Sequence, residues 1–362
     1  MSASIADPAE LLADRPASGT LGWAERGWLP DAVVRAGIRR LCAQRLADCS
    51  AGGAQLQQER QQQLIAQLRH SPMAVHTDAA NSQHYEVPTA FFQQCLGPRL
   101  KYSSCYFETD QSTLEQAESA MLELYAKRAQ LSDGQDILEL GCGWGSLTLW
   151  MAERFPQAHI TAVSNSHSQR KHILEQCQQR GLSNVEVITC DINALVLPEA
   201  RYDRCVSVEM FEHVRNHEML MARIARWLRP MGRLFVHIFA HRRLAYPFET
   251  QGEDNWMGRH FFTGGLMPST DTLLCFQRDL RIDRQWLVDG THYQRTADAW
   301  LAQQDARRPE VMRILQGAYG NPMLAALWFQ RWRMFWMACA EMFGYANGQE
   351  WLVAHYRFIR ED

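Results

Sequence analysis

The segment ILELGCGWGS at positions 137–146 constrains the fold more than any other part of the sequence. It reads as an apolar strand that enters a glycine-rich turn and then opens a helix. Gly141 and Gly143 remove side chains where the turn is tight and a ligand must approach the backbone, and Gly145 lets the helix and the strand pack closely. A single glycine triplet is weak evidence, so the rest of the chain has to support the nucleotide-binding turn that it predicts.

Short β-branched runs alternate with helical stretches from Asp133 onward. The runs are DILEL, HITAV, VEVIT, RYDRCVSV and GRLFVHIF, and they begin about 20 to 30 residues apart. Strands and helices that alternate at this spacing predict an α/β fold with a doubly wound parallel sheet. Ligands of such sheets bind at the carboxyl ends of the strands, where the glycine-rich turn also lies.

The type of ligand follows from the residues after the second and third strands. A dinucleotide site would have an acidic residue at the end of the second strand, about 20 residues beyond the glycines, to bind the ribose. This chain has VSNSHSQ at 163–169 instead, which counts against a nicotinamide enzyme. Asp191, in ITCDIN after the third strand, lies where a nucleoside-binding sheet would contact adenine. Both features indicate S-adenosylmethionine as the ligand.

Three ionisable residues lie at the end of the fourth strand, within CVSVEMFEHV at 205–214. Glu209 leaves the carboxyl end of the strand while Glu212 and His213 lie one turn further on, so the three side chains can converge. Two carboxylates and an imidazole in one small space indicate proton handling. The same acids would also complement the dipole at a helix start, and these ten residues alone leave both interpretations open.

The chain divides into three predicted regions. They are a mobile tail (1–25), a helical cap that contributes to the cofactor and substrate site (26–131), and a core (132–362) with an insertion at about 240–345. The tail is rich in Ala, Pro, Asp and Gly without a sustained period. In the cap, Ser112 and Glu115 form a capping box for a long helix. The insertion is long enough to form a lid or a wall of the pocket.

Composition and charge exclude several kinds of partner. The net charge of -3 and the pI of about 6.5 give no reason to expect nucleic acid. Ten cysteines without a CxxC pair are typical of reduced thiols in a cytoplasmic protein rather than of disulfides or structural zinc. His213 and His217 have the spacing of a metal pair, but no motif supplies a third ligand, so no metal is predicted. No uncharged apolar run approaches the roughly 20 residues of a transmembrane helix, no targeting signal is visible, and a homodimer stays open.

Five motifs in the same order resemble one known family. They are LELGCGWGS, AVSNSHSQ, SVEMFEHV, FFTGGLMPS and HYQRTADAW, and the similarity extends from about Gln83 to the C-terminus. The chain resembles the cyclopropane-fatty-acyl-phospholipid synthase superfamily, most closely its coclaurine N-methyltransferase-like branch. This resemblance implies a Rossmann-like class I methyltransferase core with a helical cap, S-adenosylmethionine as cofactor and S-adenosylhomocysteine as product.

The resemblance also implies which residues surround the cofactor. They are Tyr85, Tyr102, Ser103, Gly141, Gly143, Ser164, Asn165, Gln169, Asp191 and Ile192. In this family Gln169 resembles the ribose ligand that replaces the acid missing after the second strand.

Two chemistries occur in the superfamily. In the lipid cyclopropane synthases, residues similar to Glu212, His237 and Tyr293 help to hold a bicarbonate that acts as the base. Their fourth ligand is a cysteine, whereas YSSCY in this chain places Ser104 at that position and Cys105 one residue later. The lipid enzymes usually have a small residue in place of Glu209, while the amine methyltransferases resemble this chain with both acids and His213. The resemblance therefore favours N-methylation of a small hydrophobic or aromatic amine.

The residue types fit that chemistry. A carboxylate can bind a protonated amine, and a neighbouring His or Glu can take its proton, because the ammonium form cannot attack a methyl group. Glu209 and Glu212 are predicted to hold the amine and His213 to accept the proton, with the last two roles exchangeable. The predicted substrate pocket consists of Ser104, His237, Trp256, Phe261, Phe262, Tyr293, Trp328, Trp332 and Phe335. The alternatives are bicarbonate-dependent lipid modification with transient membrane contact, and an inactive protein that only binds S-adenosylmethionine.

Overall fold

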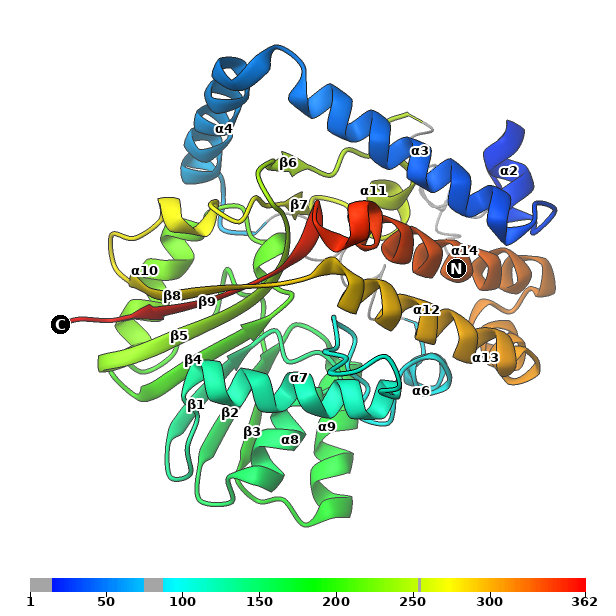
Figure 1. Cartoon of the computed structure of the whole chain (residues 1–362). Coiled ribbons are helices and arrows are strands. Elements are labelled where there is room, and N and C mark those ends of the chain that lie inside the picture. The colour runs from blue at the N-terminus through cyan, green and yellow to red at the C-terminus, as the bar shows by residue number, and fades with distance from the viewer. Residues whose placement is uncertain (1–14, 75–86, 253–254) are drawn as a thin grey trace, which may run out of the picture.

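The structure is a computed structural model of the chain and describes residues 15–74, 87–252 and 255–362 (Figure 1). Its centre is a seven-stranded sheet with the strand order β3-β2-β1-β4-β5-β9-β8. The strands are β1 (Asp136–Leu140), β2 (His159–Ser164), β3 (Val185–Thr189), β4 (Tyr202–Val208), β5 (Leu228–His241), β8 (Arg281–Val288) and β9 (Trp351–Ile359). The first five are mutually parallel, and β9 runs antiparallel to both of its neighbours.

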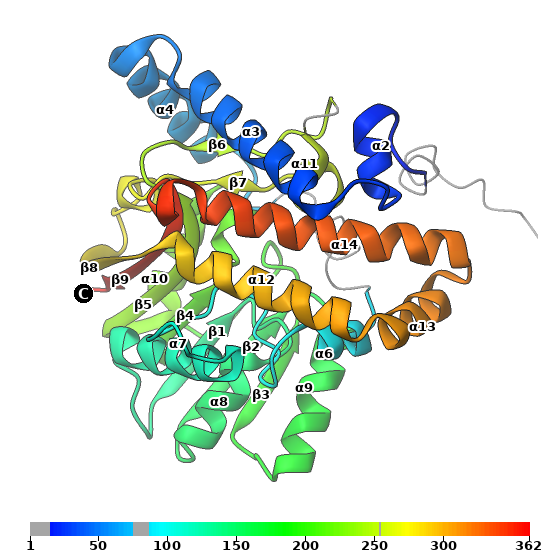
Figure 2. The same cartoon turned by 45° about the vertical axis from the view of Figure 1, so that its right-hand side comes forward.

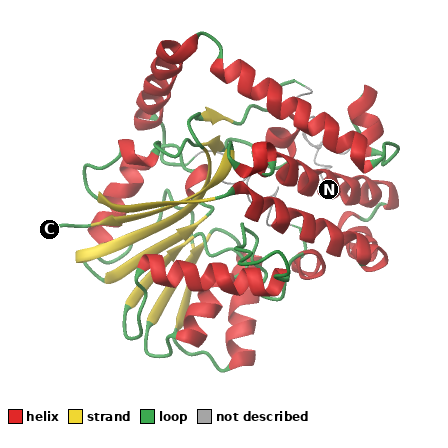
Figure 3. Cartoon of the chain, in the orientation of Figure 1, coloured by secondary structure: helices red, strands yellow, loops and turns green. Residues whose placement is uncertain are grey.

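Helices cover both faces of this sheet, because successive strand residues point to opposite sides. On one face, Val206 and Phe235 pack in the same core as Tyr125 of α7 (Leu114–Ala129). On the other face, Cys205 and Leu234 pack with α10 (His217–Trp227). Figures 1 and 3 show α7, α8 (Ser146–Arg154) and α9 (His167–Arg180) on the first face and α10 on the second. The predicted doubly wound α/β fold is confirmed.

A layer of further helices lies beside the carboxyl ends of the parallel strands (Figure 2). It consists of α2 (Gly19–Glu25), α3 (Asp31–Ser50), α4 (Gly53–His70), α6 (Thr89–Cys95), α12 (Gly290–Ala306), α13 (Arg308–Tyr319) and α14 (Pro322–Phe343). The aromatic helix α14 packs on α3 and α12, and Arg35 on α3 donates to Glu341 on α14 over 2.9 Å. None of the helices in the described part of the chain has the length and apolarity that a bilayer crossing requires.

Three predicted boundaries differ from the structure. Residues 19–25 form α2 rather than a tail, and Glu25 is buried where it accepts from Arg331 and Trp256; residues 1–14 lie outside the described residues. Helix α7, predicted as part of the cap, packs on β5 of the sheet. Its capping box uses Thr113 and Gln116 instead of Ser112 and Glu115, one residue later.

The predicted insertion is not continuous, because β8 lies inside it and pairs with β9 at the edge of the main sheet. The polar alternation of RIDRQWLV conceals this strand in the sequence. What remains is two separate segments. The first carries β6 (Tyr246–Pro247), α11 (Trp256–His260) and β7 (Leu266–Met267), and the second carries α12 to α14.

Candidate active site

The glycine-rich turn joins β1 to α8, and its three glycines have positive φ angles of 79°, 52° and 80° at Gly141, Gly143 and Gly145. A Cβ at Gly145 would lie 2.6 Å from Ile173, so this glycine permits close packing of α8 on α9 rather than on the strand. A Cβ at Gly143 would meet no atom of the described residues within 4 Å. The space beside Gly143 is therefore open to a ligand.

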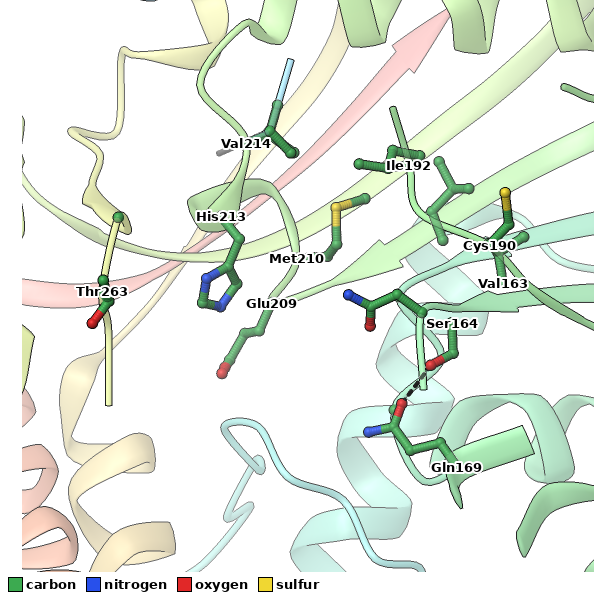
Figure 4. A pocket seen from close by; sticks show the side chains of 16 residues that line it. Val163, Ser164, Gln169, Cys190, Ile192, Glu209, Met210, His213, Val214 and Thr263 are labelled. Atoms are coloured by element: carbon green, nitrogen blue, oxygen red, sulfur yellow. Dashed lines mark hydrogen bonds between the residues drawn. The ribbon is translucent and has the colours of Figure 1, made fainter. Parts of the chain in front are cut away.

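Two connected cavities flank this turn. The first, here called the strand-end cavity (Figure 4), is lined by Gly141, Gly143, Val163, Ser164, Asn165, Gln169, Cys190, Ile192, Glu209, Met210, His213, Thr263 and a few neighbours. The second, here called the turn cavity, is lined by Lys101, Tyr102, Ser103, Tyr125, Glu139, Gly141, Gly143, Ser146, Gln169, Glu209 and others. Gly141, Gly143, Gln169 and Glu209 border both cavities, so one ligand could extend through the two.

Gln169 shows that a polar ligand fits between the cavities. Its Oε1 accepts a hydrogen bond from Ser164 Oγ over 2.6 Å, which fixes the orientation of the amide (Figure 4). Its Nε2 is buried and has no hydrogen-bond partner among the described residues. Buried donors are normally paired, so this amide has a hydrogen bond to offer to a ligand hydroxyl, as a ribose would require. The residues present therefore fit the predicted cofactor.

Most of the predicted cofactor residues border the two cavities. Those that do are Tyr102, Ser103, Gly141, Gly143, Ser164, Asn165, Gln169 and Ile192. Asp191 does not line either cavity, and its Oδ1 accepts from the backbone amide of Asn193 over 2.6 Å. Its neighbours Cys190 and Ile192 border the strand-end cavity instead. Tyr85 lies outside the described residues.

Glu209 lies where the cavities meet, directly after β4, with a φ of 47° that is unusual for a residue other than glycine. Its side chain is 11% exposed. Oε1 accepts from the backbone amide of Ser104 and lies 3.0 Å from His237 Nε2, and Oε2 accepts from the Tyr293 hydroxyl over 2.7 Å. Burial raises the pKa of Glu209, while the charge of Lys101 and the hydrogen bonds from Ser104 and Tyr293 oppose that rise.

Lys101 is a functional candidate that the sequence analysis does not single out. It is 2% exposed, and its Nζ donates to Ser103 Oγ over 2.5 Å and to the Ser104 carbonyl over 2.6 Å. The ammonium therefore supports the loop whose amide binds Glu209, and its charge acts on that carboxylate. A lysine directly before the YSSCY motif was the only signal in the sequence.

The YSSCY segment contributes a backbone amide to the site rather than the side chain predicted from Ser104. Ser104 is fully buried, and its hydroxyl donates to the carbonyl of Cys105 over 3.3 Å. The Cys105 thiol contacts the Ser103 carbonyl, and burial raises its pKa to about 12. Neither side chain borders the cavities around Glu209. The one-residue offset of the cysteine therefore does not bring a thiol into the site.

His213 and Glu212 lie in the short 3-10 helix η1 (Phe211–His213) but face different surroundings. The His213 imidazole borders the strand-end cavity and stacks on the ring of Phe262, with centroids 5.7 Å apart. Burial lowers the pKa of His213 to about 4, with Glu209 opposing the shift, so the ring is neutral near pH 7. A neutral imidazole can accept a proton.

Glu212 does not reach the cavities, contrary to its predicted role as a ligand of the amine. It is 1% exposed, and the only hydrogen bonds that act on its pKa come from the backbone at Glu212 and Phe239 among the described residues. Burial and the nearby charge of Glu209 raise the pKa of Glu212 well above its ordinary value. Burial therefore disfavours the charged form of this side chain.

A third cavity, here called the aromatic cavity, adjoins Glu209 and His213, and its lining includes no glycine of the turn. Its lining consists of Tyr102, Glu209, His213, Phe239, Phe262, Tyr293, Trp300, Phe335 and Cys339. Of the residues predicted for the substrate pocket, Phe262, Tyr293 and Phe335 line this cavity. Phe239, Trp300 and Cys339 also line it and were not predicted. Phe239, Trp300 and Cys339 are far from one another in the sequence, so the sequence gives no sign that they line the same cavity.

The other predicted aromatic residues do not line this cavity. Phe261 and Trp332 are fully buried in the core that joins α14 to the sheet. Trp328 stacks on Tyr319 with centroids 5.8 Å apart. Trp256 donates its Nε1 to Glu25 over 2.8 Å and borders a separate cavity beneath α3. These side chains pack the helical layer, as large apolar residues commonly do.

Comparison with known proteins agrees with this arrangement. Residues 74–350 match the family described as mycolic acid cyclopropane synthetase. The (S)-coclaurine N-methyltransferase of Thalictrum flavum subsp. glaucum is 38% identical over 340 residues, which cover 93% of this chain and 94% of that protein. The cyclopropane-fatty-acyl-phospholipid synthase of Escherichia coli (strain K12) is 30% identical over 231 residues, 63% of this chain and 57% of that protein.

A solved structure extends the comparison to the fold. The crystal structure of a coclaurine N-methyltransferase bound to N-methylheliamine and SAH has a TM-score of 0.90 and 37% sequence identity. The match covers 93% of this chain and 97% of that one. The chain therefore belongs to the mycolic acid cyclopropane synthetase family, in its coclaurine N-methyltransferase-like branch.

Proposed function

We propose that this protein methylates the nitrogen of a small hydrophobic or aromatic amine and uses S-adenosylmethionine as the methyl donor. The observation that carries the proposal is the environment of Glu209, a buried carboxylate held by three donors at the border of an aromatic cavity. A cationic amine is attracted to such a carboxylate, and aromatic walls bind its apolar body and its charge. Relatives named as N-methyltransferases, which cover more than nine tenths of the chain, support the same chemistry.

The geometry also argues against the lipid reaction. In the lipid enzymes that the sequence resembles, residues similar to His237 and Tyr293 hold a bicarbonate. Here the His237 Nε2 and the Tyr293 hydroxyl already bind the Glu209 carboxylate, as does the amide of Ser104. A second anion in the same place would lose these donors and be repelled by the carboxylate in a site of low dielectric constant. Glu209 therefore occupies the place that an added anion would need.

The residues of this chain divide the work of the reaction. Glu209 binds and orients the ammonium form of the acceptor, and the imidazole of His213 receives its proton, which frees the nitrogen lone pair for attack. Gln169, Ser164 and the open face of Gly143 hold the cofactor beside them. When bound, S-adenosylmethionine supplies an electrophilic methyl group for in-line displacement. The stacked Phe262 and the other aromatic walls align the acceptor and exclude water.

The cytoplasm is the compartment that fits this proposal. All ten cysteines are free thiols, seven of them buried, which suits a reducing environment. The methyl donor is also an intracellular metabolite.

A product analysis with methyl-labelled S-adenosylmethionine tests the function. The enzyme is incubated with isoquinoline-type amines or with vesicles of unsaturated phospholipid, each with and without bicarbonate. We expect a methyl group on the amine nitrogen in mass spectra, formed at the same rate in both buffers. A bicarbonate-stimulated gain of a methylene by the phospholipid, with no methylated amine, would overturn the proposal in favour of the lipid reaction. Cofactor binding without label transfer to any acceptor would favour an inactive binding protein.

A further inference from the structure

Two buried histidines extend the hydrogen bonds of Glu209 along the face of the sheet that α7 covers. His237 on β5 and His355 on β9 are direct cross-strand partners, and both are fully buried. His237 Nδ1 lies 2.8 Å from His355 Nε2, and His237 Nε2 lies 3.0 Å from Glu209 Oε1. At the far end, Arg128 Nη1 lies 2.6 Å from His355 Nδ1. The result is a continuous chain from Arg128 through two imidazoles to Glu209.

Helix α7 supplies the outer end of this chain. Tyr125 and Arg128 are three residues apart and so lie on the same face of the helix, above the two histidines. The Tyr125 hydroxyl lies 2.9 Å from His237 Nδ1, the same atom that faces His355. Arg128 is half-buried, and its guanidinium also lies over the ring of Trp286, 5.1 Å from the centroid. These contacts hold the guanidinium in one place.

The donor capacity of each group fixes the direction of every hydrogen bond. A guanidinium has only donors, so the Nδ1 of His355 must accept and its proton must be on Nε2. That Nε2–H then donates to Nδ1 of His237, which leaves the proton of His237 on Nε2. The Nε2–H of His237 in turn donates to Glu209. Burial lowers the pKa of both histidines well below the ordinary value, so each carries one proton, as this assignment requires.

The geometry points to Arg128 and His355 as positioning residues that fix the tautomer of His237, so that His237 donates to Glu209 and keeps it an oriented carboxylate for the acceptor amine. This inference rests on the proposed function and names the residues that prepare its acidic centre. The opposite tautomer of His237 would present a lone pair to the Glu209 oxygen. Glu209 would then have to turn away or take up a proton, and in either case it would bind a cationic amine less well.

This row of hydrogen bonds orients Glu209 and does not conduct protons to it. Its outer end is an arginine, which stays protonated in proteins and therefore cannot supply a proton to His355. A proton passed inward to Glu209 could not be replaced from that end. Arg128 thus fixes the tautomer of His355, and His355 in turn fixes the tautomer of His237.

The first test measures the tautomers directly. Histidine-selective isotope labelling and NMR distinguish Nδ1–H from Nε2–H, and we expect His237 and His355 to be Nε2–H tautomers in the wild-type protein. Arg128→Met should let His355 populate its other tautomer, and Arg128→Lys, which restores a cationic donor, should reverse that change. An Nδ1–H tautomer of His237 in the wild-type protein would overturn the inference even if no amine is ever methylated. The wild-type spectrum decides the matter if the variants do not fold.

The second test separates polarity from volume by kinetics. Because the Tyr125 hydroxyl also lies within hydrogen-bond distance of His237 Nδ1, Tyr125→Phe serves as the background and the reference. In that background His355→Gln keeps the polarity, since its carbonyl can accept from Arg128 and its amide can donate to His237, whereas His355→Phe fills the space without a donor. We expect His355→Phe to lower kcat/KM for a protonated amine about tenfold, mainly through KM, relative to His355→Gln. Equal kinetics and equal His237 tautomers in the two double variants would contradict the positioning role.

Discussion

The strand-end cavity and the aromatic cavity meet at Glu209 but are built in different ways. The first is formed mainly by the ends of consecutive parallel strands and by a turn whose glycines leave space for a ligand. The second collects side chains from the loop before α7, from β5, from the segment after α11 and from α12 and α14. A backbone cradle can be encoded by a short motif. An aromatic wall of this kind depends on how distant segments pack together.

The largest effect that separates the two regions is expected at Gly143. Gly143→Val should reduce the affinity for S-adenosylmethionine by about a hundredfold or more, because its side chain would occupy ligand space next to the turn. Isothermal titration calorimetry measures this loss. The matched control is Gly134→Val, since Gly134 also has a positive φ and open space around its Cβ but borders none of the three cavities. Equal affinities of the two variants for S-adenosylmethionine would show that the cofactor does not bind at the turn.

A smaller effect should separate Glu209 from Glu212 in the acceptor region. Glu209→Gln removes the charge that faces the acceptor, and we expect kcat/KM for an amine to fall about thirtyfold, mainly through KM. Glu212→Gln replaces an acid whose charged form is disfavoured by burial with a side chain of similar shape. Its loss should be at least about tenfold smaller. Steady-state kinetics with one amine compare the pair, and a larger loss for Glu212→Gln would show that the buried acid is the amine ligand instead.

The smallest effect contrasts the pH response of the two regions. Burial raises the pKa of Glu139, beside the turn cavity, to about 8, and lowers that of His213 to about 4. In the unfolded chain Glu139 loses its proton near pH 4.5, so its contribution to stability is lost as pH rises from there to about 8. His213 gains its proton near pH 6.5 in the unfolded chain, so its contribution is lost as pH falls from there to about 4.

Between pH 5 and 7, Glu139 and His213 therefore change the free energy of unfolding in opposite directions. Replacing either group should remove its part of this pH dependence. Relative to the wild-type protein, Glu139→Gln should make the free energy of unfolding rise with pH by about 2 kcal/mol over this range, and His213→Gln should make it fall by a similar amount. Urea titrations at both pH values measure the change. If both variants change the pH dependence of the free energy of unfolding in the same direction relative to the wild-type protein, these groups do not titrate as their burial implies.

Features that depend on local interactions could be predicted from the sequence. The glycine turn, the five parallel strands and the position of Glu209 directly after β4 all lie within 136–241, where the sequence predicts them. The edge strand β8 escaped detection, because its exposed face gives a polar alternation that lacks an apolar run. The capping box was displaced by one residue because Ser112 and Thr113 are both suitable caps.

The functional contacts around Glu209 could not be derived in the same way. Lys101, Tyr293 and His355 are separated from it by about 80 to 150 residues, and their approach depends on α7, α12 and β9 packing around the sheet. Even adjacent residues have different surroundings, since His213 borders the cavities while Glu212 is buried outside them. Consecutive residues of a helix point in different directions, so the orientation of the helix determines which side chain borders the cavity and which is buried. The motif alone does not specify that orientation.

The sequence by itself determined the fold class, the glycine-rich turn at the strand ends and the presence of an acidic centre, because strand period and glycine conformation are set by neighbouring residues. Only the tertiary structure decided which acid faces the acceptor, which aromatic residues surround it, and that His237 and Tyr293 bind Glu209 instead of an added anion. Those outcomes depend on burial and on hydrogen-bond direction, which arise when distant segments pack together and exclude water.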